Sequence, residues 1–125
     1  MKENDISYDI RGAAFKVHTA LGPGLLESVY EVALAHELEK LGYKVRSQVG
    51  LPVVYDDIKM EIGYRIDLLV NDLVIIEIKS VDGLADIHHK QLLTYLKLSG
   101  KKLGLLINFN VPSLKDSIIR IVNNL

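Results

Sequence analysis

The chain contains no cysteine, and its formal net charge is only -1, from 15 Lys and Arg against 16 Asp and Glu. The absence of cysteine excludes disulfides, thiolate zinc sites and thiol nucleophiles, and it permits a reducing compartment. The balanced charge excludes a surface that attracts nucleic acid as a whole. A local basic groove is still compatible with it.

Long apolar runs are also missing. No stretch approaches the roughly 18 residues that a membrane span needs, and residues 1–5 lack the apolar core of a signal peptide. We therefore expect a cytoplasmic protein that has no membrane partner.

The composition that remains is that of a folded domain. Of the 125 residues, 49% are hydrophobic and 25% are charged, which is close to the average for globular domains. The length and the absence of linker-like stretches predict a single domain over residues 1–125.

The period of the apolar residues predicts the elements. Helices are predicted over 5–21, 25–41, 84–99 and from Pro112 onward, the last carrying Leu114, Ile118, Ile119 and Val122. Strands are predicted over 43–49, 52–55, 59–70, 73–80 and 103–109. The order ααββββαβα predicts an α/β fold, with a mixed sheet flanked by helices.

Acids that interrupt apolar faces are the first candidates for a functional site, because a buried carboxylate is costly unless it is compensated. Glu77 and Lys79 share a face of the strand over 73–80, which a surface ion pair would also explain. Asp67 lies on the preceding strand. A two-residue turn would place Asp67 and Glu77 on opposite faces, whereas a three-residue loop or a bulge would pair them. If paired, their oxygens would suit Mg²⁺.

Two helices contribute further polar candidates. Glu27 projects along the apolar stripe of Tyr30 and Leu34, although an acid in a first helical turn also interacts favourably with the helix dipole. Gln91 lies one turn before Tyr95 on the inner face of the helix over 84–99, where a helix edge is the alternative. The adjacent pair His88 and His89 diverges by about 100°, which disfavours a shared zinc ion.

Several of these residues form an ordered set of short motifs. They are Gly24-x-x-Glu27-x-x-Tyr30, Asp67, Glu77-Ile78-Lys79 and Gln91-x-x-x-Tyr95, with Leu106-Ile107-Asn108-Phe109 and Pro112-Ser113-Leu114-Lys115 behind them. The set resembles the GxxExxY family of the PD-(D/E)XK nuclease superfamily, from about Leu21 to Val122. One departure is that Ile66, not proline, precedes Asp67.

This resemblance implies a restriction-endonuclease-like αβββαβ core, here with extra N- and C-terminal helices. It also implies a Mg²⁺-dependent nuclease, with Mn²⁺ as an alternative ion. By position, Glu27, Asp67 and Glu77 match metal-binding acids and Lys79 matches the active-site lysine. Gln91 and Tyr95 match the Q-x-x-x-Y helix motif. We therefore expect these six residues to converge in one pocket at one edge of the sheet.

The expected partner is nucleic acid, in particular DNA. Because phosphate contacts dominate nucleic-acid affinity, the net charge of -1 also predicts that the domain self-associates or needs a protein partner. Two other interpretations remain open at this point. One is a non-catalytic module that binds nucleic acid or protein on the same fold, and the other is a structural α/β domain with a chance cluster of acids.

Overall fold

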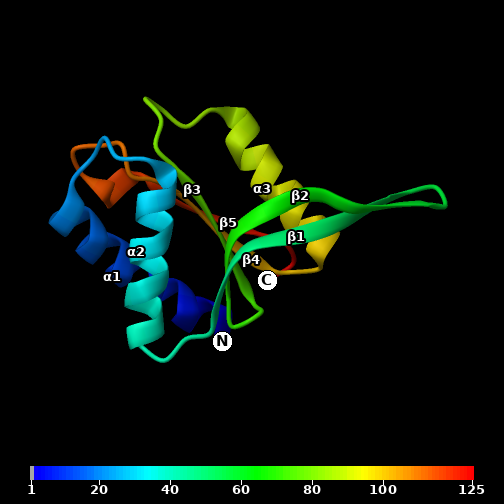
Figure 1. Ribbon diagram of the computed structural model, residues 1–125, viewed down its shortest axis with the longest axis horizontal. Helices are drawn as coiled ribbons and strands as arrows, with labels where there is room; N and C mark the ends of the chain where they lie inside the picture. Colours follow the sequence, from blue (N-terminus) through cyan, green and yellow to red (C-terminus); the bar gives the residue numbers. More distant parts are fainter. Residues whose placement is uncertain (1) are drawn as a thin grey trace.

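A five-stranded mixed sheet in the order β1-β2-β3-β4-β5 forms the centre of the molecule in the computed structural model, which describes residues 2–125 (Figure 1). Its strands are β1 (Val45–Tyr55), β2 (Ile58–Val70), β3 (Val74–Lys79), β4 (Leu103–Asn108) and β5 (Ile118–Val122). Strands β3 and β4 pair in parallel, and the other neighbours pair antiparallel. The α/β fold with a mixed sheet flanked by helices, as in restriction endonucleases, is therefore confirmed.

Helices cover both faces of this sheet. Helices α1 (Lys2–Leu21) and α2 (Glu27–Lys40) pack on one face, and α3 (Asp86–Ser99) packs on the other (Figure 1). Residues of β3 and β4 are almost all buried. Because both faces of these two strands are covered, their sequences are continuous apolar runs and do not alternate with polar residues.

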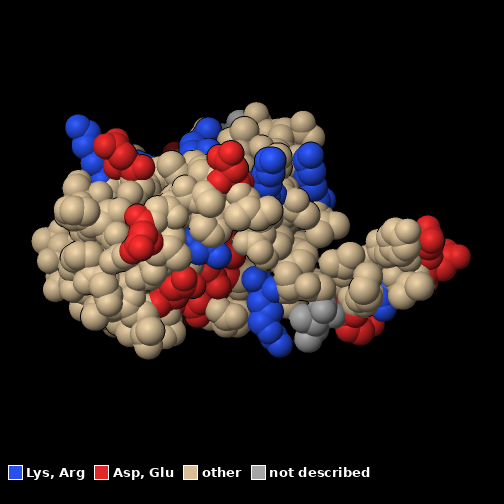
Figure 2. All heavy atoms as spheres, turned by 90° about the horizontal axis from the view of Figure 1, so that it is seen from above, with Lys and Arg blue, Asp and Glu red and all other residues tan. Residues whose placement is uncertain are grey.

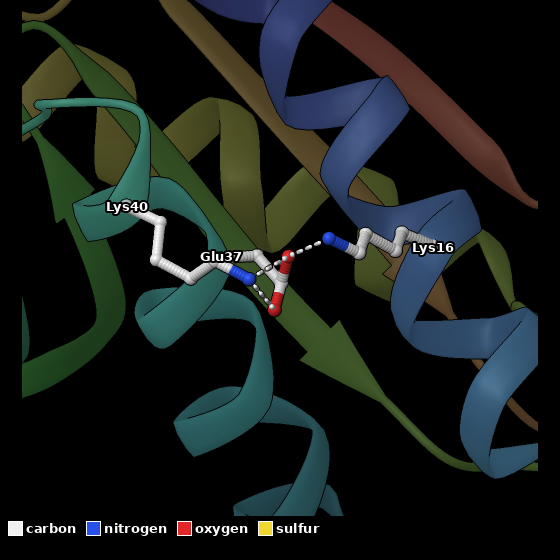
Figure 3. A network of polar contacts seen from close by, with 3 residues as sticks. All are labelled: Lys16, Glu37 and Lys40. Atoms are coloured by element: carbon white, nitrogen blue, oxygen red, sulfur yellow. Dashed lines mark hydrogen bonds and ion pairs between the residues drawn. The ribbon is translucent and has the colours of Figure 1, made fainter.

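The first two helices are also joined at their exposed faces. Lys16 Nζ of α1 lies 2.9 Å from Glu37 Oε1 of α2, and Lys40 Nζ lies 3.3 Å from Glu37 Oε2 (Figure 3). The hydrogen bond from Lys16 holds the pKa of Glu37 below its usual value. Glu37 lies toward the C-terminal end of α2, whereas Glu27 begins this helix, so Glu37 can serve as a control acid in the experiments below.

The two short strands expected over 43–49 and 52–55 form one strand, β1. Its pairing with β2 shifts register between Leu51 and Val53, on either side of Pro52. Proline has no N–H to donate, and an edge strand tolerates that loss. The end of the β1–β2 hairpin projects beyond the helices (Figure 1).

The final helix expected from Pro112 onward is wrong. A 3₁₀ turn, η1 (Leu114–Asp116), leads into strand β5, which pairs with β4. Leu114 and Ile118 have helical spacing, but residues 118–122 are rich in β-branched side chains, which favour a strand. Ile119 and Ile121 pack toward α3, whereas Ile118 belongs to the core under α1 and α2.

Candidate active site

The loop between β2 and β3 settles the register that the sequence left open. Val70 pairs with Val74 and Leu68 with Ile76, so three residues, 71–73, form the loop. Asn71 and Asp72 adopt left-handed φ angles of 50° and 59°, which Asn and Asp tolerate better than most residues. One step beyond Leu68 and Ile76, Asp67 therefore faces Glu77.

Asp67 and Glu77 are joined through each other's strand. The Asp67 backbone N–H donates to Glu77 Oε2 at 2.9 Å, and the Ile78 N–H donates to Asp67 Oδ2 at 2.8 Å. These two bonds continue the contact between the strands beyond their last backbone pair. One oxygen of each carboxylate is thereby fixed by the sheet. Of the other two, Asp67 Oδ1 also accepts a hydrogen bond from Gln48 Nε2 at 3.4 Å, and each carboxylate oxygen keeps a further lone pair that can bind a ligand.

The electrostatics of this pair favour a cation. Glu77 is 5% exposed, and burial first, then the charge of Asp67, raises its pKa to about 8. Burial also raises the pKa of Asp67, against the opposing effects of the Ile78 N–H, Gln48 and Lys79. Two partly desolvated carboxylates side by side are costly without positive charge, which a bound divalent ion would supply.

Glu27 reaches the same place from the first turn of α2. Its Oε2 accepts a hydrogen bond from the Ser80 N–H at 3.3 Å, just beyond β3, and the Ser80 hydroxyl donates to the Leu25 carbonyl at 2.7 Å. The charge of Glu27 raises the pKa of both Asp67 and Glu77. Glu27 is exposed, so it lies at the border of the apolar stripe and not within it.

Tyr30 fixes the segment that leads into Glu27. Its hydroxyl donates to the Gly22 carbonyl at 2.6 Å and accepts from the Leu25 N–H at 3.1 Å. The ring is fully buried and stacks on Phe109, with 4.4 Å between centroids. Gly24 has a φ of 93° in this segment, a conformation that glycine adopts readily. The spacing of Gly24, Glu27 and Tyr30 is therefore explained by the turn before α2 and the first turn of that helix, which the Tyr30 hydroxyl holds together.

Lys79 is the last residue of β3 and follows Glu77 on the same strand face. Its charge lowers the pKa of both Asp67 and Glu77. Within residues 2–125, Lys79 forms no ion pair. The backbone around it is fixed, because the Lys79 carbonyl accepts from the Phe109 N–H at 3.0 Å and the buried Asn108 side chain bonds both the N–H and the carbonyl of Val81.

On the α3 side, Tyr95 faces the acids. It is 8% exposed, and its pKa is raised by burial and by the charges of Glu77 and Asp67, while a hydrogen bond with Gln91 opposes the rise. Its ring stacks on Tyr64 of β2, with centroids 3.8 Å apart. Gln91 is exposed and contacts Tyr95, so it lies at the rim. His88 and His89 bond the backbone of Ala85 at the start of α3.

Asp67 and Glu77 bond to each other's strands, and Glu27 bonds to Ser80 just beyond β3. Lys79 ends β3, and the charges of the two β-strand acids act on Tyr95. These acids lie at the C-terminal end of β3, which is an inner strand of the sheet. Sequence reasoning missed two polar neighbours. Glu31 lies one turn after Glu27, a spacing that could have revealed it, and Gln48 Nε2 donates to Glu31 Oε1 at 2.7 Å.

The donor set fits a small hard cation. In the part of the chain that the structure describes, no three acids or histidines are close enough to hold an ion by themselves. Mg²⁺ does not require that many, since it keeps several waters and is commonly held by one or two carboxylates together with substrate phosphates. The carboxylates of Asp67 and Glu77 are such a pair.

Comparison with known proteins identifies the superfamily of the chain. No curated protein matches the chain. The family model of the PD-(D/E)XK nuclease superfamily matches residues 4–121, which include β1 to β4, all of β5 except Val122 and all the acids described above. Since the match covers nearly the whole chain, the protein belongs to the PD-(D/E)XK nuclease superfamily.

Proposed function

We propose that the protein is a Mg²⁺-dependent nuclease that hydrolyses phosphodiester bonds in DNA, with Mn²⁺ as an alternative ion. We also propose that it belongs to the GxxExxY branch of its superfamily, because Gly24, Glu27 and Tyr30 form one structural unit beside the acids. Membership of a nuclease superfamily supports the reaction class.

The observation that carries this proposal is the convergence of Asp67 and Glu77, with Lys79 next on the same strand face. Asp67 Oδ1 and Glu77 Oε1 would hold the ion, and Glu27 would reach it through water. A bound divalent ion supplies Lewis-acid polarisation of the phosphate and lowers the pKa of a coordinated water.

The remaining residues would act on the substrate and the attacking water. The Lys79 ammonium is a compact positive charge that can orient the water or stabilise the charge that develops on the phosphate. It is not engaged in an ion pair among the described residues, which leaves it available for this role. Tyr95 and Gln91, one helical turn apart on α3, would position the substrate by hydrogen bonds.

Charge suggests that binding of nucleic acid depends on more than one chain. Lys and Arg are scattered over the face shown in Figure 2, and acids lie at the end of the projecting hairpin, where Asp56 and Asp57 form the turn (Figure 2). We therefore propose that a second copy or a protein partner supplies part of the phosphate-binding surface. Sedimentation equilibrium tests this, and a monomer that cleaves efficiently alone at physiological salt would contradict it.

Incubation with single-stranded DNA, double-stranded DNA and RNA, each in Mg²⁺ or in EDTA, tests the function itself. The proposal predicts Mg²⁺-dependent cleavage of DNA that Glu77→Gln abolishes. Binding without cleavage would identify a non-catalytic module instead. Neither binding nor cleavage would leave the fold with a structural role.

A further inference from the structure

Gln48 has an unusual backbone for its position. Its φ is 52°, in the left-handed region, although it lies inside strand β1. Among residues 2–125, the other non-glycine residues with positive φ are all Asn or Asp, which tolerate this region better. A strained residue of this kind persists where the surrounding structure or a function requires it.

The conformation changes which way the neighbouring side chains face. Ser47 pairs with Leu68 and Val49 with Ile66, so Gln48 stands opposite Asp67. Regular alternation would put Ile66 and Leu68 on the same face, but Ile66 packs toward α3 and Leu68 toward α1 and α2. The break in alternation therefore falls at Asp67, the residue whose carboxylate reaches across to β3.

The Gln48 side chain then joins two acids from different elements. Its Nε2 donates to Glu31 Oε1 of α2 at 2.7 Å and lies 3.4 Å from Asp67 Oδ1 of β2. A carboxamide offers two N–H donors and carries no charge. It can therefore hold the two carboxylates side by side and leave their charges intact. A lysine or arginine in the same place would neutralise part of that charge. The negative charge of both acids remains available to a cation.

We infer that Gln48 is a positioning residue of the site, which orients Asp67 and holds Glu31 beside it, where the charge of Glu31 acts on the bound ion without coordinating it. This inference rests on the proposed function, since it concerns the same Mg²⁺. Hydrogen-bonding partners of metal ligands commonly contribute 10- to 100-fold to metal affinity. Gln48 is such a hydrogen-bonding partner of Asp67, which we propose as a ligand of the ion.

Calorimetric titration of the full chain with Mg²⁺, together with thermal melting, tests the inference. Gln48→Gly removes the donor and suits the left-handed backbone, so the melting temperature should stay the same or rise while Mg²⁺ binds about 10-fold more weakly. Gln48→Asn keeps a Cβ and an amide but is one methylene shorter, so it should weaken binding similarly. Asp56→Gly is the matched control, because Asp56 has a φ of 53° at the hairpin turn and should leave Mg²⁺ affinity unchanged.

A double-mutant cycle with Glu31→Gln separates positioning from general damage. If Gln48 and Glu31 act as a unit, the loss in the double variant should be clearly smaller than the sum of the two single losses. Additive losses, or Gln48→Gly binding Mg²⁺ as tightly as the parent, would overturn the inference and leave the proposed function standing. A parent that binds no Mg²⁺ would overturn both.

Discussion

Asp67 and Glu77 hold each other through the backbone: the Asp67 N–H donates to the Glu77 carboxylate, and the Asp67 carboxylate accepts from the next residue after Glu77. Beyond the last paired residues of β2 and β3, the two side-chain carboxylates thus accept backbone N–H bonds that backbone carbonyls accept in a regular sheet. The orientation of both acids is therefore set by the sheet, before any ion binds. Such preorganisation is what a precise metal site requires.

The first prediction ranks the acids by their contribution to metal binding. Asp67→Asn and Glu77→Gln should each weaken Mg²⁺ affinity by at least about 100-fold, because a direct ligand should matter more than its hydrogen-bonding partners. Glu27→Gln should cost less, about 10-fold, since Glu27 is exposed and contacts Ser80. Calorimetric titration with Mg²⁺ measures all three.

Glu37→Gln is the control for this ranking, because Glu37 is an acid of the same helix as Glu27 and pairs with Lys16 and Lys40. It should bind Mg²⁺ as the parent does. Equal affinities for the parent and Glu77→Gln would show that the buried acid is not a ligand.

The second prediction concerns stability in metal-free buffer. The pKa of Glu77 is raised from 4.5 to about 8 in the folded state, so the folded protein binds more protons than the unfolded chain between these values. Stability should therefore fall as pH rises through this window, by up to about 1.4 kcal/mol per pH unit from this group. Urea unfolding in EDTA at pH 5 and pH 8 measures the fall.

Glu77→Gln should lose most of this pH dependence, and a smaller slope of the same sign should remain because the pKa values of Asp67 and Glu31 are also raised. Adding Mg²⁺ to the parent at pH 8 should restore stability, since a ligand that binds only the folded state stabilises it. If the variant kept the full slope of the parent, another group would be the cause.

The third prediction tests how Glu27 is positioned. Tyr30→Phe keeps the ring on Phe109 but removes the hydroxyl that bonds Gly22 and Leu25. The variant should lose about 1 kcal/mol of stability because the partly buried Gly22 carbonyl and the Leu25 N–H lose their shared partner. Its Mg²⁺ affinity should fall to about that of Glu27→Gln. Chemical unfolding and calorimetry provide the two numbers.

Tyr43→Phe is the matched control for this variant. It also removes a hydroxyl contact, with Asp9, but near the other end of α2. It should lose stability and leave Mg²⁺ affinity unchanged. If both variants weakened Mg²⁺ binding equally, the segment held by Tyr30 would have no special role.

Most of the fold could be predicted because periodicity reports burial directly. The helical period of the apolar residues predicts α1, α2 and α3, and the continuous apolar runs predict the buried strands β3 and β4. Strand β5 could not, since Leu114, Ile118 and Val122 fit a helical spacing while the β-branched residues at 118–122 favour a strand. Pairing with β4 decided between them, and tertiary pairing of this kind is invisible in local sequence.

The sequence singled out Asp67 and Glu77, but it did not determine the register that places them side by side. The side-chain period of 2 makes the faces of Asp67 and Glu77 depend on one residue of loop length, and the loop over 71–73 gave no unique answer. Gln48 could not be found at all, because its role depends on a left-handed φ inside a strand. Glu31 could have been, since it follows Glu27 by one helical turn.

The central claim is that Asp67 and Glu77 bind the ion and that Lys79 serves the chemistry. Lys79 has the same sign of charge as the ion and lowers the pKa of both acids, so it cannot be a ligand. Lys79→Ala should leave Mg²⁺ affinity unchanged or slightly higher. Cleavage should nevertheless fall by about 100-fold or more, which is the usual cost of removing one group that stabilises developing charge.

The most direct test measures both quantities on one preparation of Lys79→Ala whose circular dichroism matches that of the parent: Mg²⁺ affinity by calorimetry, and the rate of DNA cleavage at saturating Mg²⁺. We predict parental affinity together with a cleavage rate lowered by about 100-fold. Cleavage at the parental rate would contradict the account, because Lys79 would then be only a structural partner of the carboxylates.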